Sequence, residues 1–207
     1  YIADGHHRAA SAARTRAEML ARAIAGHSLG DGADANTVLA VAFPDNQVQV
    51  LPYNRVVKDL AGLTADGFEQ AVRARFDVSD GPATPVRPGD VAMYFSGTWR
   101  TLRVKQPPDG TDTIASLDVS VLQDQLIGPV LGITDVRTDK RIDFVGGVRG
   151  TVELERLVQS GRAAVAFSLY PVAVEQLIAV SDAGAIMPPK STWFEPKLRD
   201  GLLVHVI

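Results

Sequence analysis

The N-terminal segment constrains the fold most strongly, because it places polar residues between a strand pattern and a helix pattern. Tyr1–Ala3 is predicted to be the end of a strand, and Ala9–Ile24 is predicted to be a helix with apolar residues at three- and four-residue spacings. The turn between them reads Asp4-Gly5-His6-His7-Arg8. A strand-turn-helix unit presents free backbone N–H groups and the positive end of the helix dipole to a ligand. The turn is therefore predicted to bind an anion.

Each residue of this turn has chemistry that suits a phosphate site. Gly5 allows a positive φ or a close approach of the backbone to a ligand, and Arg8 can donate two parallel hydrogen bonds to a phosphate. His6 and His7 can donate, accept or transfer a proton near neutral pH. Asp4 can bind a metal ion or orient a histidine. The alternative is a capped helix whose charged residues face water.

The turn and the Ala-rich helix after it resemble the signature turn of the ParB/sulfiredoxin-like superfamily. The five-residue form is similar to that of the free-serine kinases in this superfamily. A second segment, Met187–Lys197 (MPPKSTWFEPK), together with the turn, resembles the family called domain of unknown function 1015. The resemblance implies an α/β fold in which the turn contacts the phosphates of a nucleotide. It also implies that a sizeable region precedes the turn, carrying the glutamate that acts as catalytic base in the serine-kinase relatives.

Composition bounds the function classes. The chain has 207 residues and is expected to form a single α/β domain over 1–207, as the C-terminal part of a longer chain, with a weak sub-boundary in the Pro/Gly-rich stretch 80–89. The net charge of −3 gives no global basic field, so neither nucleic acid nor a membrane is an expected partner. The absence of cysteine excludes disulfides, thiol catalysis and Cys-ligated zinc. No apolar run is long enough to cross a bilayer and no signal peptide is visible, so a cytoplasmic location is expected.

The remaining pattern predicts mixed β-sheets with packed helices. Helices are expected after Thr64 as N-cap, after Ser116 or Asp118, after the glycine-rich turn at 146–151, and with Pro171 in the first turn. A surface loop is expected over 26–36, and hairpins are expected at 37–51 and 90–105. The expected strands cover 37–43, 47–51, 90–96, 99–105, 142–145, 163–169 and 201–207.

Two isolated cationic positions have two interpretations each. Arg55 follows the second strand of the first predicted hairpin and either reaches an anion or forms a surface salt bridge. Arg149 lies in the glycine-rich turn Gly146–Thr151, which either cradles a second anion or is a structural turn. The turn lacks the terminal Gly-Lys-Ser/Thr of a phosphate-binding P-loop.

The second family-like segment carries a mobile cation beside two hydroxyls, Lys190-Ser191-Thr192. This combination suits phosphate oxygens and, through a hydroxyl, a bound Mg²⁺. The prolines before Lys190 stiffen its approach, and Lys197 adds a second cation seven residues later. The alternative is a surface loop with solvated lysines. We hypothesise that this segment and the Asp4 turn share one nucleotide site.

Three functions follow from these observations. The first is an ATP- or ADP-dependent phosphotransferase of the free-serine-kinase type, acting on a small hydroxyl metabolite with Mg²⁺. The second is a nucleotide-binding module without chemistry, and the third is a structural or regulatory domain. In the first, the catalytic residues are Asp4, His6 and His7, the phosphate-binding residues are Gly5, Arg8, Lys190, Ser191 and Thr192, and Asp4 is the Mg²⁺ ligand.

Overall fold

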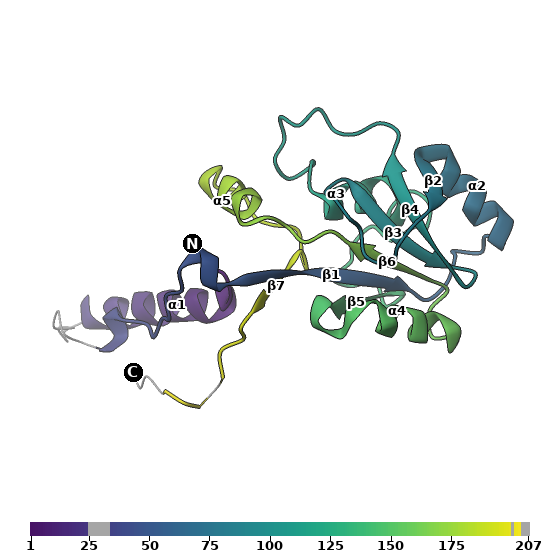
Figure 1. Cartoon of the computed structure of the whole chain (residues 1–207). Helices are drawn as coiled ribbons and strands as arrows, with labels where there is room; N and C mark the ends of the chain where they lie inside the picture. The colour runs from purple at the N-terminus through teal and green to yellow at the C-terminus, as the bar shows by residue number, and fades with distance from the viewer. Residues whose placement is uncertain (25–33, 200, 204–207) are drawn as a thin grey trace. The chain divides into compact units, whose positions relative to one another are not determined.

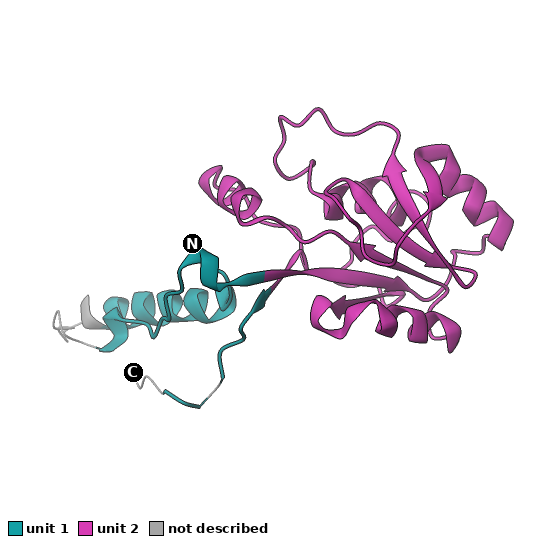
Figure 2. Ribbon diagram, viewed as in Figure 1, with its two compact units in different colours: residues 1–49, 194–207 teal, residues 50–193 magenta. Residues whose placement is uncertain are grey.

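The computed structural model describes residues 1–24, 34–199 and 201–203. The chain divides into two compact units (Figure 2). Unit 1 comprises Tyr1–Gln49 and Phe194–Ile207, and unit 2 comprises Val50–Trp193. Helices and strands both occur, which confirms the α/β class predicted from the sequence.

A single seven-stranded sheet organises the described part of unit 2 (Figure 1). The strand order is β2-β4-β3-β6-β1-β5, and β7 also pairs with β1. The strand pairings with a defined register are antiparallel, and they place Arg55 of β1 opposite Phe144 of β5 and Phe167 of β6. The strands are β1 (Gln49–Val57), β2 (Phe76–Asp80), β3 (Asp90–Phe95), β4 (Thr98–Val104), β5 (Ile142–Gly146), β6 (Val165–Leu169) and β7 (Thr192–Glu195).

The hairpin of β3 and β4 forms where the sequence predicts it. Its turn residues, Ser96 and Gly97, have φ values of 50° and 81°. Two successive positive φ values match the twist of the flanking strands, and glycine adopts such values at little cost. Tyr94 and Trp99 pack across the hairpin with ring centroids 5.1 Å apart, as expected for a packing pair.

Helices cover both faces of the sheet (Figure 1). α2 (Ala65–Arg75) and α3 (Asp118–Leu122) pack on one face, in a buried cluster that includes Val57 and Phe68. α4 (Gly150–Gln159) packs on the other face, in a cluster that includes Val56 and Leu154. Successive residues of a strand point to opposite faces of the sheet. Val56 and Val57 of β1 therefore show that the two clusters lie on opposite faces. α3 continues into a π-helical turn, η3 (Gln123–Ile127), and α5 (Val174–Asp182) precedes β7.

Unit 1 is built on α1 (His6–Ile24), with 3₁₀ turns η1 (Asp34–Asn36) and η2 (Asp45–Gln47). Arg16 Nε of α1 donates to Asn36 Oδ1 of η1 at 3.0 Å. Of the apolar residues predicted to share a face of this helix, Ala9, Ala12, Met19 and Leu20 are half-buried, whereas Ala13 is exposed.

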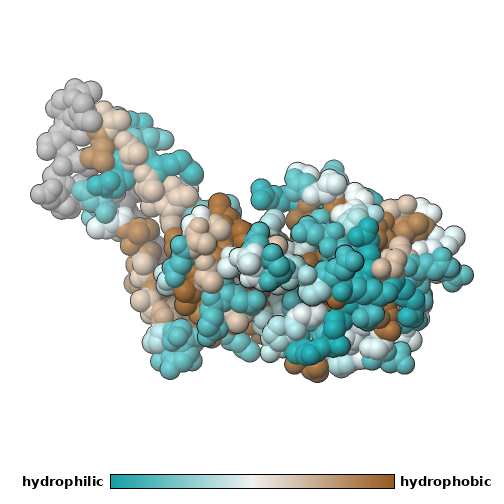
Figure 3. All heavy atoms as spheres, turned by 90° about the horizontal axis from the view of Figure 1, so that it is seen from above, coloured by the Kyte–Doolittle hydropathy of each residue, from teal (hydrophilic) through white to brown (hydrophobic). Residues whose placement is uncertain are grey.

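Two predicted strands of unit 1 are wrong. Tyr1–Ala3 has no regular secondary structure, so the N-terminal unit is a turn and a helix without the strand. The segment 37–43 is likewise irregular, and its large apolar side chains, from Val38 to Phe43, are 40–55% exposed. Apolar residues are visible at the surface in Figure 3. A β-branched apolar run becomes a strand only when another strand pairs with it, and among the described residues none pairs with 37–43.

Several predicted boundaries also shift. The strand predicted over 47–51 begins at Gln49 and continues to Val57. Neither Ser116 nor Asp118 caps α3. The Ser116 hydroxyl donates to the carbonyl of Asp112 at 2.7 Å, and Asp118 Oδ1 accepts from Gly89 N at 2.9 Å. Pro171 precedes α5, which begins at Val174. Residues 201–203 form no strand, while 204–207 and most of the predicted loop 26–36 lie outside the described residues.

No helix within the described ranges is both long enough and apolar enough to cross a membrane.

Candidate functional site

The N-terminal turn is shaped by Gly5, the residue before α1. Gly5 has a φ of 88°, its N–H donates to Asp4 Oδ1 at 2.8 Å, and its carbonyl accepts from Ala9 N at 3.0 Å. A Cβ on Gly5 would lie 3.6 Å from Arg8 Nε, an ordinary contact. Glycine is therefore required for its backbone conformation, which a side chain would strain.

An ion pair joins this turn to the last residue of the second family-like segment. Lys197 Nζ lies 2.8 Å from Asp4 Oδ2. The hydrogen bond from Lys197 lowers the pKa of Asp4 below its ordinary value, with further lowering by the Gly5 N–H and the positive charge of Arg8. The sequence identifies Lys197 only as a second cation of its segment. It does not indicate that Lys197 pairs with Asp4, 193 residues away. Membership in the Met187–Lys197 segment was the signal that could have marked it.

The turn is open to solvent. Asp4, His6, His7 and Arg8 are exposed, and the side chain of Lys197 is 40% exposed. The first N–H groups of an α-helix have no acceptor within the helix. Here the helix follows a turn that carries Asp4 and is paired through it with Lys197, and Arg8 lies in the first turn of the helix. Such an arrangement can bind an anion.

A metal site in this turn would depend on Asp4 alone. No group of three or more His, Cys, Asp or Glu side chains able to hold a metal occurs in residues 1–24, 34–199 and 201–203. Mg²⁺ commonly takes one or two carboxylates and completes its shell with phosphates and water. Asp4 as a Mg²⁺ ligand therefore stays a prediction.

The turn at Lys190 belongs to unit 2. The Lys190 backbone is left-handed, with a φ of 57°, and its Nζ lies 5.3 Å from the centroid of the Tyr53 ring. Ser191 is buried, and its hydroxyl donates to the carbonyl of Pro188 at 2.5 Å. Thr192, half-buried, begins β7. Lys190 is thus the exposed member of the predicted phosphate-binding triplet.

Arg55 departs from both interpretations of its sequence position. It is 2% exposed, so it neither forms a surface salt bridge nor meets an external anion. Its Nη1 donates to the carbonyl of Tyr53 at 2.6 Å, and its Nη2 donates to the carbonyl of Lys190 at 3.2 Å. The guanidinium also lies 5.4 Å from the centroid of the Phe144 ring. Burial lowers the pKa of Arg55 to about 9, which leaves the group charged at neutral pH.

The glycine-rich turn at 146–151 has a packing explanation that needs no anion. A Cβ on Gly146 would lie 2.5 Å from the Trp193 ring, and a Cβ on Gly147 would lie 2.8 Å from Pro52. Neither neighbour could move aside cheaply, because one is a large ring and the other a proline in β1. Arg149 itself is exposed.

A small cavity in unit 2 lies between the start of α3 and the Lys190 turn. It is lined by residues that include Asp118, Tyr170 and Ser191. Burial raises the pKa of Asp118 to about 6, against the lowering effect of the Gly89 N–H.

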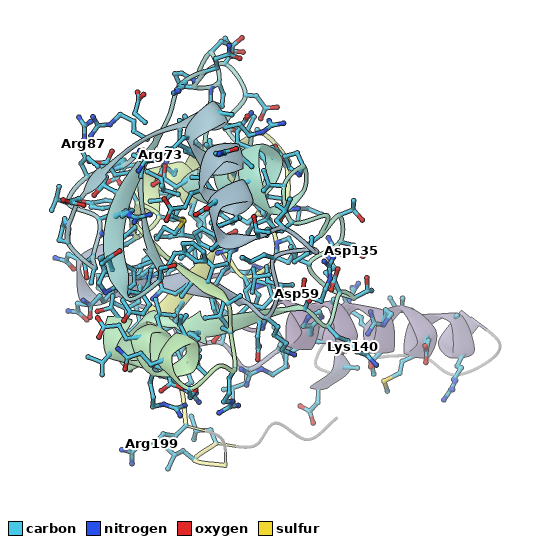
Figure 4. The ribbon with its side chains drawn as sticks, turned by 90° about the vertical axis from the view of Figure 1, so that its right-hand side faces the viewer. Asp59, Arg73, Arg87, Asp135, Lys140 and Arg199 are labelled. Atoms are coloured by element: carbon cyan, nitrogen blue, oxygen red, sulfur yellow. The ribbon has the colours of Figure 1, made fainter. Side chains whose placement is uncertain are left out.

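A further charged cluster ties loops of unit 2 together, near the labelled Asp59 and Lys140 of Figure 4. Arg141 pairs with Asp139 at 2.8 Å and donates to the carbonyl of Leu131 at 2.9 Å. Lys58 Nζ donates to the carbonyl of Lys140 at 2.6 Å. Because these groups satisfy one another, the cluster has a structural explanation.

The Asp4 turn and the Lys190 turn fall in different units. A site that both turns share therefore stays a prediction.

Comparison with known proteins gives a family and weak structural likenesses. The model of a family described as "Protein of unknown function (DUF1015)" matches residues 1–120. The search of curated protein sequences found no match. Among solved structures, a mutant free serine kinase in complex with AMP is similar at 13% identity and a TM-score of 0.43, covering 72% of this chain and 55% of that one. A mutant in complex with ADP has 14% identity and a TM-score of 0.41, with 72% and 54% covered. A free serine kinase in complex with AMP has 10% identity and a TM-score of 0.43, with the same coverage.

The chain spans about 55% of the length of the first of these structures. At such identities and TM-scores the likeness is weak.

Proposed function

Because the chain belongs to the DUF1015 family of proteins of unknown function, we propose a function from its own site: the N-terminal turn binds the phosphates of ATP or ADP. We further propose that the protein is a phosphotransferase of the free-serine-kinase type, with a small hydroxyl metabolite as acceptor. The observation that carries the proposal is the ion pair of Lys197 with Asp4, which brings a second cation to the turn that also carries Arg8.

Three features of this turn support phosphate binding. The start of a helix combines unsatisfied N–H donors with the positive end of the dipole. Arg8 can hold a phosphate by two parallel hydrogen bonds. Lys197 is a compact point charge, which suits a phosphate oxygen, and Asp4 holds it at the turn.

The roles of the individual residues follow from the chemistry of phosphoryl transfer, in which positioning and charge stabilisation do most of the work. Arg8 and Lys197 stabilise the charge on the phosphate. A phosphate contact of Lys190, the exposed residue of the second turn, stays a prediction. His6 or His7 contacts the phosphoryl group or transfers a proton. Asp4 orients Lys197 and is the predicted Mg²⁺ ligand.

Thermal unfolding with nucleotides tests the proposal. The midpoint of the 1–207 chain is expected to rise with ATP or ADP, because a ligand at one hundred times its Kd stabilises the folded state by about 2.7 kcal/mol. The rise should disappear in Arg8→Ala and weaken in Lys197→Ala. Arg22→Ala is the matched control, because Arg22 is an exposed arginine in the last turn of the same helix. Its response should equal that of the unmodified chain.

The outcomes separate the candidate functions. A rise that survives in Arg8→Ala would move the ligand away from the turn, and no rise with any nucleotide would remove the nucleotide proposal. Repeating the titration with and without Mg²⁺ tests the metal. Phosphoryl transfer to free serine, detected as the formation of phosphoserine, distinguishes a kinase from a binding module.

A further inference from the structure

We infer that Arg55 is a positioning residue for Lys190: it holds the turn that presents the lysine, without touching a ligand itself. The role of Lys190 at a phosphate rests on the proposed function. The role of Arg55 in holding the turn rests on the geometry of unit 2 alone.

Burying the guanidinium of Arg55 in unit 2 carries a cost. Arg55 is charged at neutral pH and 2% exposed. Within the part of the chain that the structure describes, no carboxylate lies within ion-pair distance of it. Apolar side chains of similar volume often replace even a buried ion pair without loss of stability. The guanidinium therefore calls for an explanation other than filling space.

The N–H donors of Arg55 bind two backbone carbonyls. Nη1 binds the carbonyl of Tyr53, two residues before Arg55 in β1, and Nη2 binds the carbonyl of Lys190. The Tyr53 ring in turn lies below Lys190 Nζ. Arg55 thus connects the strand residue that contacts the ammonium group to the backbone that carries it. No apolar replacement can make these two hydrogen bonds.

The turn at Lys190 has an unusual backbone conformation. A left-handed backbone is unfavourable for a residue with a Cβ, and Lys190 adopts it with a φ of 57°. Two side chains hold the turn on either side: Arg55 binds the Lys190 carbonyl, and the Ser191 hydroxyl binds the Pro188 carbonyl. Removing the bond from Arg55 should let the turn relax and move the ammonium group away from Tyr53.

Limited trypsin digestion without ligand tests the geometric part. Trypsin cleaves after lysine and arginine, and the Lys190–Ser191 bond is guarded by the bound carbonyl and the buried serine. The readout is the cleavage rate at Lys190 divided by the rate at Arg137, an exposed residue with an exposed neighbour. Arg55→Met should raise this ratio about tenfold, as expected for loss of one charge-assisted hydrogen bond. Arg55→Lys keeps the charge but has fewer donors, so its cleavage ratio should lie between those of the unmodified chain and Arg55→Met.

Arg100→Met is the matched control. Arg100 is another arginine of the sheet. Its side chain is 20% exposed, and it pairs with Glu69 on α2. It should leave the ratio unchanged, because general loosening would raise cleavage at Lys190 and Arg137 together. An unchanged ratio in both Arg55 variants, or an equal rise in Arg100→Met, overturns the inference.

A double-mutant cycle with ATP tests whether Arg55 acts through Lys190. Arg55→Met and Lys190→Met should weaken ATP binding by similar factors, and the double variant should be no weaker than Lys190→Met alone. Losses that multiply in the double variant would show that Arg55 acts independently of Lys190 and overturn this part. Absence of ATP binding in the unmodified chain would instead remove the proposed function, and the trypsin ratio would still decide the role of Arg55.

Discussion

Asp118 is a single residue whose ionisation opposes folding. Burial raises the pKa of its carboxyl from 3.8 to about 6. Below pH 3.8 the group is protonated in the folded and unfolded states alike. Between pH 3.8 and about 6 the folded state binds the proton more tightly, so stability falls as the pH rises through this window. Above it the half-buried carboxylate is charged, at a cost of up to about 3 kcal/mol.

Asp118→Asn should remove this pH dependence. The amide oxygen can still accept from Gly89 N, while the buried charge disappears. We expect the variant to be more stable than the unmodified chain at pH 8, by up to about 3 kcal/mol, and similar to it at pH 3.5. Urea unfolding at the two pH values measures the difference. A difference between the two proteins that is the same at both pH values would contradict the assignment to Asp118.

At the scale of one element, α2 depends on its N-cap residue, Thr64. Thr64 accepts a hydrogen bond from Gly67 N at 3.1 Å, which satisfies one of the free donors of the helix start. Thr64→Ala should destabilise the protein by about 1 kcal/mol. Thr64→Ser keeps the hydroxyl and is the control, with a change of only a few tenths of a kcal/mol expected. Equal losses in the two variants, measured by urea unfolding, would place the effect of Thr64 in packing and not in capping.

Elements with local signals could be predicted from the sequence, whereas elements that need a distant partner could not. α2 carries its cap and its apolar spacing within a dozen residues, and the β3–β4 hairpin carries its own turn. The segment 37–43 has the composition of a strand, but pairing is decided elsewhere in the chain.

The candidate site shows the same division. Asp4 and Arg8 are adjacent in the sequence and mark the turn at once, but the bond of Asp4 to Lys197 spans 193 residues. The environment of Arg55 depends on Lys190, 135 residues further on. A local sequence pattern indicates neither of these two contacts. The resemblance to a family identified the Asp4 turn and the Met187–Lys197 segment, but not the contacts that their residues make.

At the scale of the whole molecule, burial predicts which side chains carry stability. Phe68 is fully buried under the sheet, whereas Phe43, in the irregular segment 37–43, is 40% exposed. The residue type is the same, so the comparison isolates burial. Phe68→Ala should cost about 3–5 kcal/mol, and Phe43→Ala should cost about 0.5 kcal/mol or less.

Chemical denaturation of both variants measures these two costs side by side. A large loss in Phe43→Ala would mean that the segment 37–43 is covered in solution. A small loss in Phe68→Ala would contradict the core described for unit 2.

The sheet order also dictates a sequence of events during synthesis. β1 leaves the ribosome before its neighbours β5, β6 and β7, which are made about ninety residues or more later. Pairings between segments so far apart close large loops and slow folding. The guanidinium of Arg55 therefore stays in water until Lys190 has been made, since its second acceptor is the carbonyl of Lys190. A nascent chain that stops short of that residue lacks both the lysine and the last bond that fixes its turn.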